Sequence, residues 1–87
     1  MASVSDVVGE LESAKGQMEG ARSTLDDAGA ATDEMIGQAQ AMELVAAAEG
    51  MRALRGQIDA LTEQLAAVSG GVDALITAAG ALREGGD

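Results

Sequence analysis

The 87-residue chain contains no aromatic residue, no cysteine, no histidine and no proline. Without cysteine there is no disulfide framework and no thiol chemistry. Without histidine the commonest acid–base catalyst and a common metal ligand are both missing. No Ser–His or Cys–His pair can form, and the Glu-x-x-His ligand pairs of helical metal centres are excluded as well. We therefore expect no enzymatic activity, no catalytic residue, no cofactor and no metal site.

The composition that remains is acidic and rich in small residues. Fifteen acidic residues against five basic ones give a net charge of −10, 47% of the residues are hydrophobic, and glycine occurs 12 times. The length limits the chain to one domain, residues 1–87. Because nucleic acids and anionic membranes are polyanions, the negative charge disfavours both as partners. No uninterrupted 18-residue apolar stretch is visible, so we expect no membrane span.

Apolar residues recur with a seven-residue period in both halves of the chain. We letter the heptads abcdefg with Val4 and Met51 at position a, so that Val7 and Leu54 occupy position d. In the second half, steps of three and four alternate through Leu44, Ala47, Met51, Leu54, Ile58, Leu61, Leu65, Val68, Val72, Leu75, Ala79 and Leu82. In the first half, position a holds Val4, Leu11, Met18, Leu25 and Thr32, and position d holds Val7, Ala14, Ala21, Ala28 and Met35. Such a/d patterns are typical of long helices with one apolar seam.

The two heptad series are out of phase near the middle of the chain. The break predicts an all-α, coiled-coil-like antiparallel hairpin with a helix over about 3–36, a turn over about 37–42 and a helix over about 43–84. Ile36 and Gly37 are the predicted turn residues, with Gly37 as the helix C-cap. Ser3 and Asp6 have the spacing of a capping box at the start of the first helix. Gly85-Gly86 is expected to end the second helix, with Arg83 in its last turn.

Two registers of the hairpin are compatible with this pattern. One places Ala14 opposite Leu65 and Ala21 opposite Ile58, and a shift by one heptad moves the turn to about residue 43. In both registers a small residue faces a large one, so the sequence leaves the choice open. The predicted seam comprises Val4, Val7, Leu11, Met18, Leu25, Met35, Leu44, Met51, Leu54, Ile58, Leu61, Leu65, Val68, Val72, Leu75 and Leu82.

Small residues and charges also follow the heptad. Gly9, Gly16, Gly20, Gly56 and Gly70 lie away from the seam and form a candidate outer small face. That face allows close approach of another helix, or it reflects tolerance of small residues at exposed sites. Position b of the first half is acidic and position e carries most of the cations. These charges form local pairs along one helix or a charged edge that orients a partner helix.

An acidic, Ala- and Gly-rich hairpin of this length resembles the Trp-x-Gly superfamily of actinobacterial type VII (ESX) secretion substrates. The position that matches the family's turn motif is Met35-Ile36-Gly37, which keeps the glycine and lacks the tryptophan. The family's C-terminal Tyr-x-x-x-Asp/Glu export signal has no counterpart, because the chain has no tyrosine. The resemblance implies a long hairpin that pairs side by side with another hairpin into a four-helix bundle.

A lone hairpin of this composition is expected to be marginally stable, because interior glycines each cost about 1 kcal/mol relative to alanine. We therefore expect a structural assembly module whose partner is itself, in a helical bundle or larger assembly. The alternatives are a type VII-like secreted substrate that binds another hairpin protein, and a regulator whose acidic face covers a basic surface. The N-terminus shows no basic and apolar signal regions, so we expect a cytoplasmic product, with signal-peptide-independent secretion as the alternative.

Overall fold

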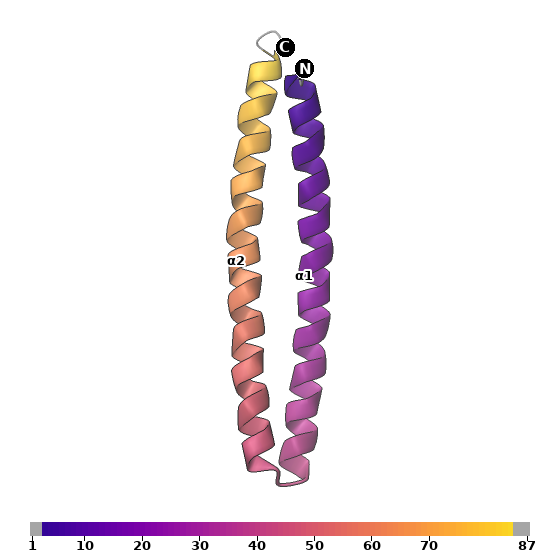
Figure 1. Ribbon diagram of the computed structural model, residues 1–87, viewed down its shortest axis with the longest axis vertical. Helices are drawn as coiled ribbons and strands as arrows, with labels where there is room; N and C mark the ends of the chain where they lie inside the picture. The colour runs from indigo at the N-terminus through magenta and orange to yellow at the C-terminus, as the bar shows by residue number, and fades with distance from the viewer. Residues whose placement is uncertain (1–2, 85–87) are drawn as a thin grey trace. The chain divides into compact units, whose positions relative to one another are not determined.

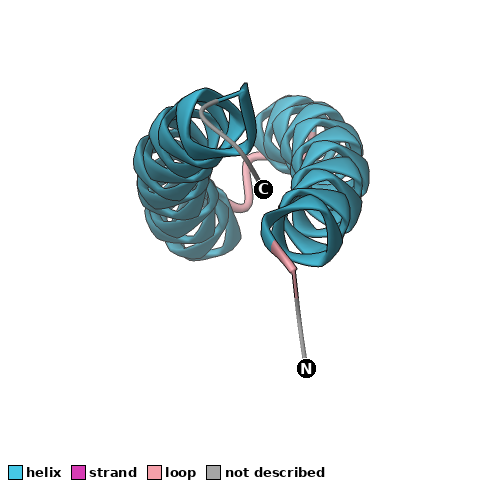
Figure 2. Cartoon of the chain, turned by 90° about the horizontal axis from the view of Figure 1, so that it is seen from above, coloured by secondary structure: helices cyan, strands magenta, loops and turns pink. Residues whose placement is uncertain are grey.

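The computed structural model describes residues 3–84, which form two long helices. Helix α1 spans Val4–Ala41 and helix α2 spans Val45–Glu84. Within each of the two compact units described below, a stretch of α1 and a stretch of α2 lie side by side in opposite directions, as expected for a hairpin (Figures 1 and 2). No strand occurs within residues 3–84. The prediction of an all-α two-helix hairpin is confirmed.

A capping box begins α1 where the sequence predicts it. The Ser3 Oγ accepts a hydrogen bond of 3.2 Å from the Asp6 backbone N–H, and the Asp6 carboxylate accepts one of 3.2 Å from the Ser3 backbone N–H. Two backbone donors that have no partner inside the helix are thereby satisfied. At the other end of the chain α2 retains Arg83 in its last turn, whereas Gly85 and Gly86 lie outside the described residues.

Helix α1 ends later than the sequence suggests. It continues through Ile36 and Gly37 to Ala41, so these two residues are helical and the turn occupies residues 42–44. The predicted turn over 37–42 is therefore wrong. A glycine inside a helix costs only about 1 kcal/mol relative to alanine. Ala39 is 4% exposed, and its burial favours continuation of α1 beyond Gly37.

The turn is a Schellman motif without glycine. The Leu44 N–H donates to the Ala39 carbonyl at 2.8 Å, and the Glu43 N–H donates to the Gln40 carbonyl at 3.0 Å. Glu43 has a φ of 60°, the left-handed conformation that this motif requires at its C′ position. Because a side chain at positive φ is strained, glycine normally takes this place. The absence of glycine here explains why the sequence does not mark the turn.

Replacement of Glu43 by glycine is expected to stabilise the hairpin by about 1 kcal/mol, because glycine removes the steric cost of the left-handed conformation. The measurement is thermal or urea unfolding followed by circular dichroism. Glu43→Gln is the matched control, since it removes the charge and keeps the strain, and it should leave stability nearly unchanged. Equal gains from both variants would instead attribute the effect to charge.

The structure separates into two compact units. We call them the end unit, which combines Met1–Ala21 with Leu65–Asp87, and the turn unit, which is Arg22–Gln64. Each unit contains one stretch of α1 and one stretch of α2. Contacts between the two helices are described below within each unit.

The interior of the hairpin is thin. Among the described residues the buried hydrophobic side chains are Val8, Ala39, Ala48 and Val72, and none of the described side chains is less than 2% exposed. Two of these four residues are alanines, which bury little surface. The contact between α1 and α2 is therefore narrow, and most large apolar side chains keep part of their surface in water.

Candidate self-association surface

Position a of the heptad faces the neighbouring helix in both units. In α1 the residues Val4, Leu11, Met18 and Leu25 are half-buried, and in α2 the residues Met51, Ile58 and Leu65 are half-buried while Val72 is buried. Thr32, at position a of α1, is 7% exposed. This column of the predicted seam lies between the helices. Leu44, which the sequence places at position a, lies instead in the turn and is 48% exposed.

Position e supplies the second column of the contact between α1 and α2. In α1 this column includes the buried Val8 and Gly29 and the half-buried Ile36. In α2 it includes the buried Ala48 and a half-buried set, Arg55, Thr62, Ser69 and Ile76. The sequence analysis missed these positions, because polar residues interrupt the column in α2. Its one signal in the sequence is the placement of cations at position e.

Position d, the other half of the predicted seam, is largely exposed. Its large side chains are exposed by 42% to 68% of their surface: Val7, Met35, Leu54, Leu61, Val68, Leu75 and Leu82. They are covered less than the residues at position a, and their contact with the neighbouring helix stays a prediction. Positions d and e lie on opposite sides of position a, so a small rotation of each helix toward e exposes d. We call the residues at position d of both helices the d columns.

An ion pair joins the two helices in the end unit. The Lys15 Nζ lies 2.7 Å from a carboxylate oxygen of Asp73. This hydrogen bond and the negative charge of Asp73 raise the pKa of Lys15 above its usual 10.5, with smaller contributions from Glu19 and Glu12 and with desolvation acting in the opposite sense. Because the pKa is raised on folding, the stabilisation is present at neutral pH and is lost as pH rises through the raised pKa.

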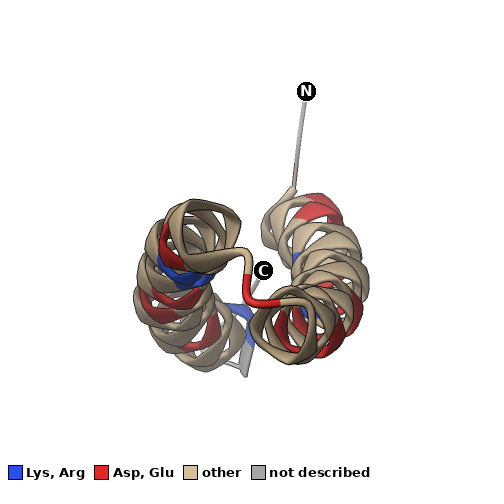
Figure 3. Ribbon diagram, turned by 90° about the horizontal axis from the view of Figure 1, so that it is seen from below, with Lys and Arg blue, Asp and Glu red and all other residues tan. Residues whose placement is uncertain are grey.

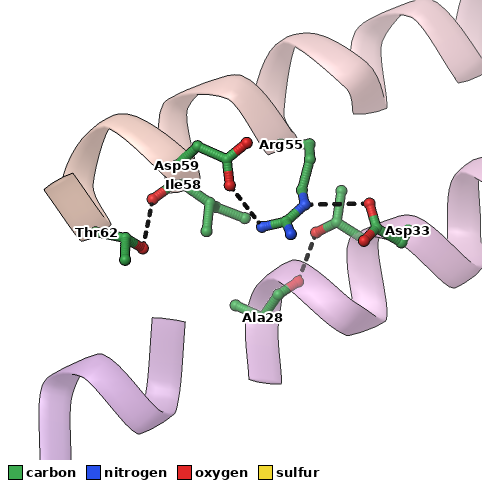
Figure 4. Close-up of polar contacts among 7 residues, drawn as sticks. Ala28, Asp33, Arg55, Ile58, Asp59 and Thr62 are labelled. Atoms are coloured by element: carbon green, nitrogen blue, oxygen red, sulfur yellow. Dashed lines mark hydrogen bonds and ion pairs between the residues drawn. The ribbon is translucent and has the colours of Figure 1, made fainter. Parts of the chain in front are cut away.

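Arg55 links the helices in the turn unit (Figure 4). Its Nε donates to Asp33 of α1 at 3.1 Å, and its Nη1 lies 2.9 Å from Asp59 one turn along α2. The guanidinium crosses α1 at Gly29, where an added Cβ would collide with it. Gly29 is therefore required for close approach of the Arg55 side chain and marks neither a kink nor a helix end.

These ion pairs exclude the register that places Ala14 opposite Leu65. Lys15 pairs with Asp73 and Asp33 pairs with Arg55, close to the register shifted by one heptad, which places the turn at about residue 43 and Lys15 opposite Gly71. Each pair joins a cation at position e to an acid at position b of the other helix. The charged columns thus form an edge between α1 and α2, with Arg55–Asp59 as an additional local pair.

Hydroxyl groups near the contact between the helices are satisfied locally. Thr32 donates to the Ala28 carbonyl at 2.7 Å, and Thr62 donates to the Ile58 carbonyl at 3.0 Å. Ser69 donates to the sulfur of Met18 across the end unit at 3.4 Å. No buried side-chain nitrogen or oxygen of the described residues lacks a partner. Polar residues therefore occupy position e without the cost of an unpaired buried group.

The glycines of the candidate outer small face have open space where a side chain would lie. A Cβ added at Gly9, Gly16, Gly20, Gly56 or Gly70 would meet no atom within 4 Å. These positions are exposed. The hairpin itself therefore gives them no packing role.

Charge is unevenly distributed around α2. Acidic residues recur along both helices and basic ones are few (Figure 3). The charged residues of α2 are all at positions b, e and f: Glu49, Arg52, Arg55, Asp59, Glu63, Asp73, Arg83 and Glu84. Positions c, d and g between Gly50 and Leu82 carry no charge, and position c is alanine in every heptad. The side of α2 that presents its d column is therefore uncharged.

Helix α2 also contains a segment long and apolar enough to cross a membrane by length and composition. This helix, Val45–Arg83, reaches a mean hydropathy of 1.6 over its most apolar 18-residue window. Alanine and glycine separate the larger residues without adding charge, which raises the mean hydropathy although polar residues interrupt the apolar run. The absence of a membrane span stays a prediction. Between Gln64 and Leu82 the one charged residue is Asp73, which pairs with Lys15.

An open hollow of about 520 Å³ lies beside the turn, in the turn unit. It is lined by Gln40, Glu43, Leu44, Val45, Ala48 and Arg52. All of these residues except Ala48 are exposed. Among the described residues no group of three or more Asp or Glu side chains is placed to hold a metal ion.

Compared with known proteins, the chain matches no family model, no curated protein and no solved structure. The features of this chain that bear on its function are therefore the hairpin and the d columns.

Proposed function

We propose that the chain is a non-enzymatic assembly module, a helical hairpin that self-associates into a helical bundle. The observation that carries the proposal is the exposure of the d columns. Leu54 and Leu61 in the turn unit, and Leu75 in the end unit, each keep half or more of their surface in water. Large apolar side chains repeated at heptad spacing on an exposed helix surface are typical of an interface.

The heptad pattern also matches a bundle of more than two helices. Within the hairpin each helix uses positions a and e, and the apolar position d remains outside the contact. Helices at the core of a bundle bury three positions in seven, a and d together with e or g. Burial of d against further helices completes this pattern. A two-helix contact alone leaves it incomplete.

The thin interior supports the same proposal. Four buried hydrophobic side chains among residues 3–84 offset little of the conformational entropy of ordering the chain, which is about 1.5 kcal/mol per residue. Further burial of the half-exposed columns would add about 25 cal/mol for each Å² of apolar surface removed from water. Association therefore supplies the stabilisation that the hairpin lacks.

The proposal is tested by light scattering of the purified chain after size-exclusion chromatography at micromolar concentration. The expected mass is twice the 8.6 kDa of one chain, or a higher multiple. The midpoint of thermal unfolding should also rise with concentration, because folding is linked to association. A helical monomer with a midpoint independent of concentration would overturn the proposal.

A second candidate is a hairpin that pairs with a different hairpin protein, as in type VII-like secretion substrates, with export that needs no cleaved signal. The exposed d columns support pairing with a different hairpin protein as much as they support self-association. The Met35-Ile36-Gly37 triplet lies within α1, so this candidate has no support from the turn. It predicts a chain that is monomeric and weakly helical alone and that gains helicity on mixing with its partner.

A further inference from the structure

The d columns of the two helices differ in size. At the level of the Lys15–Asp73 pair in the end unit, the adjacent d positions are Ala14 on α1 and Leu75 on α2. At the level of the Asp33–Arg55 pair in the turn unit, they are Met35 and Leu54. The next level of the turn unit combines Ala28 with Leu61.

The size difference produces a ridge beside a trough. The ridge is the d column of α2, which consists of Leu54 and Leu61 in the turn unit and Val68, Leu75 and Leu82 in the end unit. The trough is the middle of the d column of α1, where Ala14, Ala21 and Ala28 follow one another at steps of seven between the larger Val7 and Met35. The alanine side chains of α1 are small and leave space at the surface of the helix. The larger side chains of α2 project further and fill the corresponding space.

Both columns lie on the same side of the hairpin in each unit. Along a helix viewed from its N-terminus, position d lies about 60° to one side of position a, and e lies about 40° to the other. In two antiparallel helices that contact through a and e, both d columns turn to one side, and the charged b and e positions turn to the opposite side. In each unit one side is therefore apolar and the other carries an ion pair between the helices.

Charge distribution identifies the apolar side as suitable for a like-charged partner. The flanking g positions are Gln57, Gln64, Gly71 and Ala78 on α2, and on α1 they are uncharged except for Glu10. Two chains that each carry a net charge of −10 can meet at this side with few negative charges facing one another across the contact. Depletion of charge at the centre of a surface is typical of protein interfaces. For a membrane with anionic lipid the same net charge is unfavourable.

We propose that a second copy of this chain covers the apolar side, with a two-fold axis parallel to the helices. Under this symmetry the α2 ridge of each copy lies in the α1 trough of the other, and every neighbouring pair of helices in the resulting four-helix bundle is antiparallel. A surface with a ridge and a matching trough side by side is complementary to itself, which is the requirement of a two-fold interface. The alternative two-fold axis, perpendicular to the helices, would place ridge against ridge.

This inference rests on the proposed function and specifies its surface, partner and symmetry.

The first test introduces a charge on the ridge of the full chain. Leu61→Glu should reduce the mass to that of one chain at a concentration where the original sequence is associated, because a carboxylate cannot be buried without a partner. Ala66→Glu, at an exposed b position of the same helix, is the matched control and should retain the associated mass. An associated Leu61→Glu variant would overturn this surface and leave self-association standing. A monomeric original chain would overturn both proposals.

The second test does not depend on the fold tolerating a buried charge. Because the chain has no cysteine, an equimolar mixture of an Ala14→Cys variant and a Leu75→Cys variant reports which positions meet. Ridge in trough predicts a disulfide-linked heterodimer, identified by mass spectrometry, since a disulfide needs Cα atoms within about 7 Å. Ser23→Cys mixed with Ala66→Cys, both exposed away from the d columns, should remain unlinked.

One outcome of the second experiment contradicts the proposed symmetry, and a separate vesicle experiment tests the occupant of the apolar side. A Leu75→Cys variant that links mainly to itself would indicate ridge against ridge. Sedimentation of the original chain with phosphatidylcholine vesicles, abolished by Leu61→Glu, would assign the apolar side to a lipid surface and overturn the second copy as its occupant. Absence of sedimentation together with the heterodimer supports the proposal.

Discussion

Simultaneous replacement of Gly9, Gly16, Gly56 and Gly70 by alanine is expected to raise the free energy of unfolding by about 3–4 kcal/mol. Each glycine lies inside a helix, where alanine is favoured by about 1 kcal/mol. An added Cβ would meet no atom within 4 Å at any of these positions, so the gain has no steric cost. The effects should add because the four sites share no partner.

Thermal unfolding followed by circular dichroism measures this gain. For a domain of this size 1 kcal/mol corresponds to about 4–8 °C, so the midpoint should rise by about 12–32 °C. If the four glycines were instead the surface through which copies associate, methyl groups there would lower the associated fraction. A lower midpoint together with a lower mass by light scattering would therefore assign the interface to the glycine face rather than to the d columns.

Gly29→Ala is the internal control for the four-site variant. The helix gains the same propensity, but the new Cβ displaces the Arg55 guanidinium and breaks its hydrogen bond to Asp33. An exposed ion pair contributes about 0.2–1 kcal/mol, so gain and loss should nearly cancel. In an Arg55→Ala background the same substitution should recover the full stabilisation. A full gain in both backgrounds would show that Arg55 does not depend on Gly29.

Val72→Asn is expected to destabilise the hairpin by about 3 kcal/mol. Val72 is 8% exposed and faces α1 in the end unit. The substitution removes the apolar contribution of a buried valine, about 1.5–3 kcal/mol, and buries an amide without a designed partner. Valine and asparagine have nearly the same helix propensity, so the loss reports packing between the helices. Urea unfolding of both proteins at equal concentration measures it.

Val45→Asn provides the same chemical change at an exposed site. Val45 is the first residue of α2 and is 66% exposed, so this variant should lie within about 0.5 kcal/mol of the original protein. The difference between the two variants isolates burial at position 72. Equal effects at positions 45 and 72 would contradict the placement of the a column between α1 and α2.

Local features of the hairpin follow from residues that are near one another in the sequence. The heptad pattern predicts two long helices, and Ser3 with Asp6 predicts the start of α1, because capping depends on neighbours within one turn. The a columns were also predicted to face the neighbouring helix. By contrast, the turn was misplaced: Glu43 adopts the left-handed conformation without being glycine, and nothing in its chemistry marks it for that role.

The rotation and the register of the helices were decided only by tertiary structure. A seven-residue repeat is unchanged by a shift of seven, so apolar periodicity cannot choose between registers. The choice is seen instead in Lys15–Asp73 and Asp33–Arg55, which join residues far apart in the chain. Position a has apolar residues on both sides, at d and at e. The sequence pattern is therefore compatible with contact through a and d or through a and e, and the packing of the two helices selects a and e.

The sequence by itself therefore determined that this protein is helical and acidic, that it has no histidine or cysteine, and that it has more apolar columns than one hairpin can bury. The tertiary structure decided which columns the hairpin buries and which it leaves exposed. The physical reason is that helix formation and capping depend on residues within a few positions of each other, whereas rotation and register depend on contacts between two helices. Exposure of the d columns, the basis of the proposed assembly, belongs to this second group.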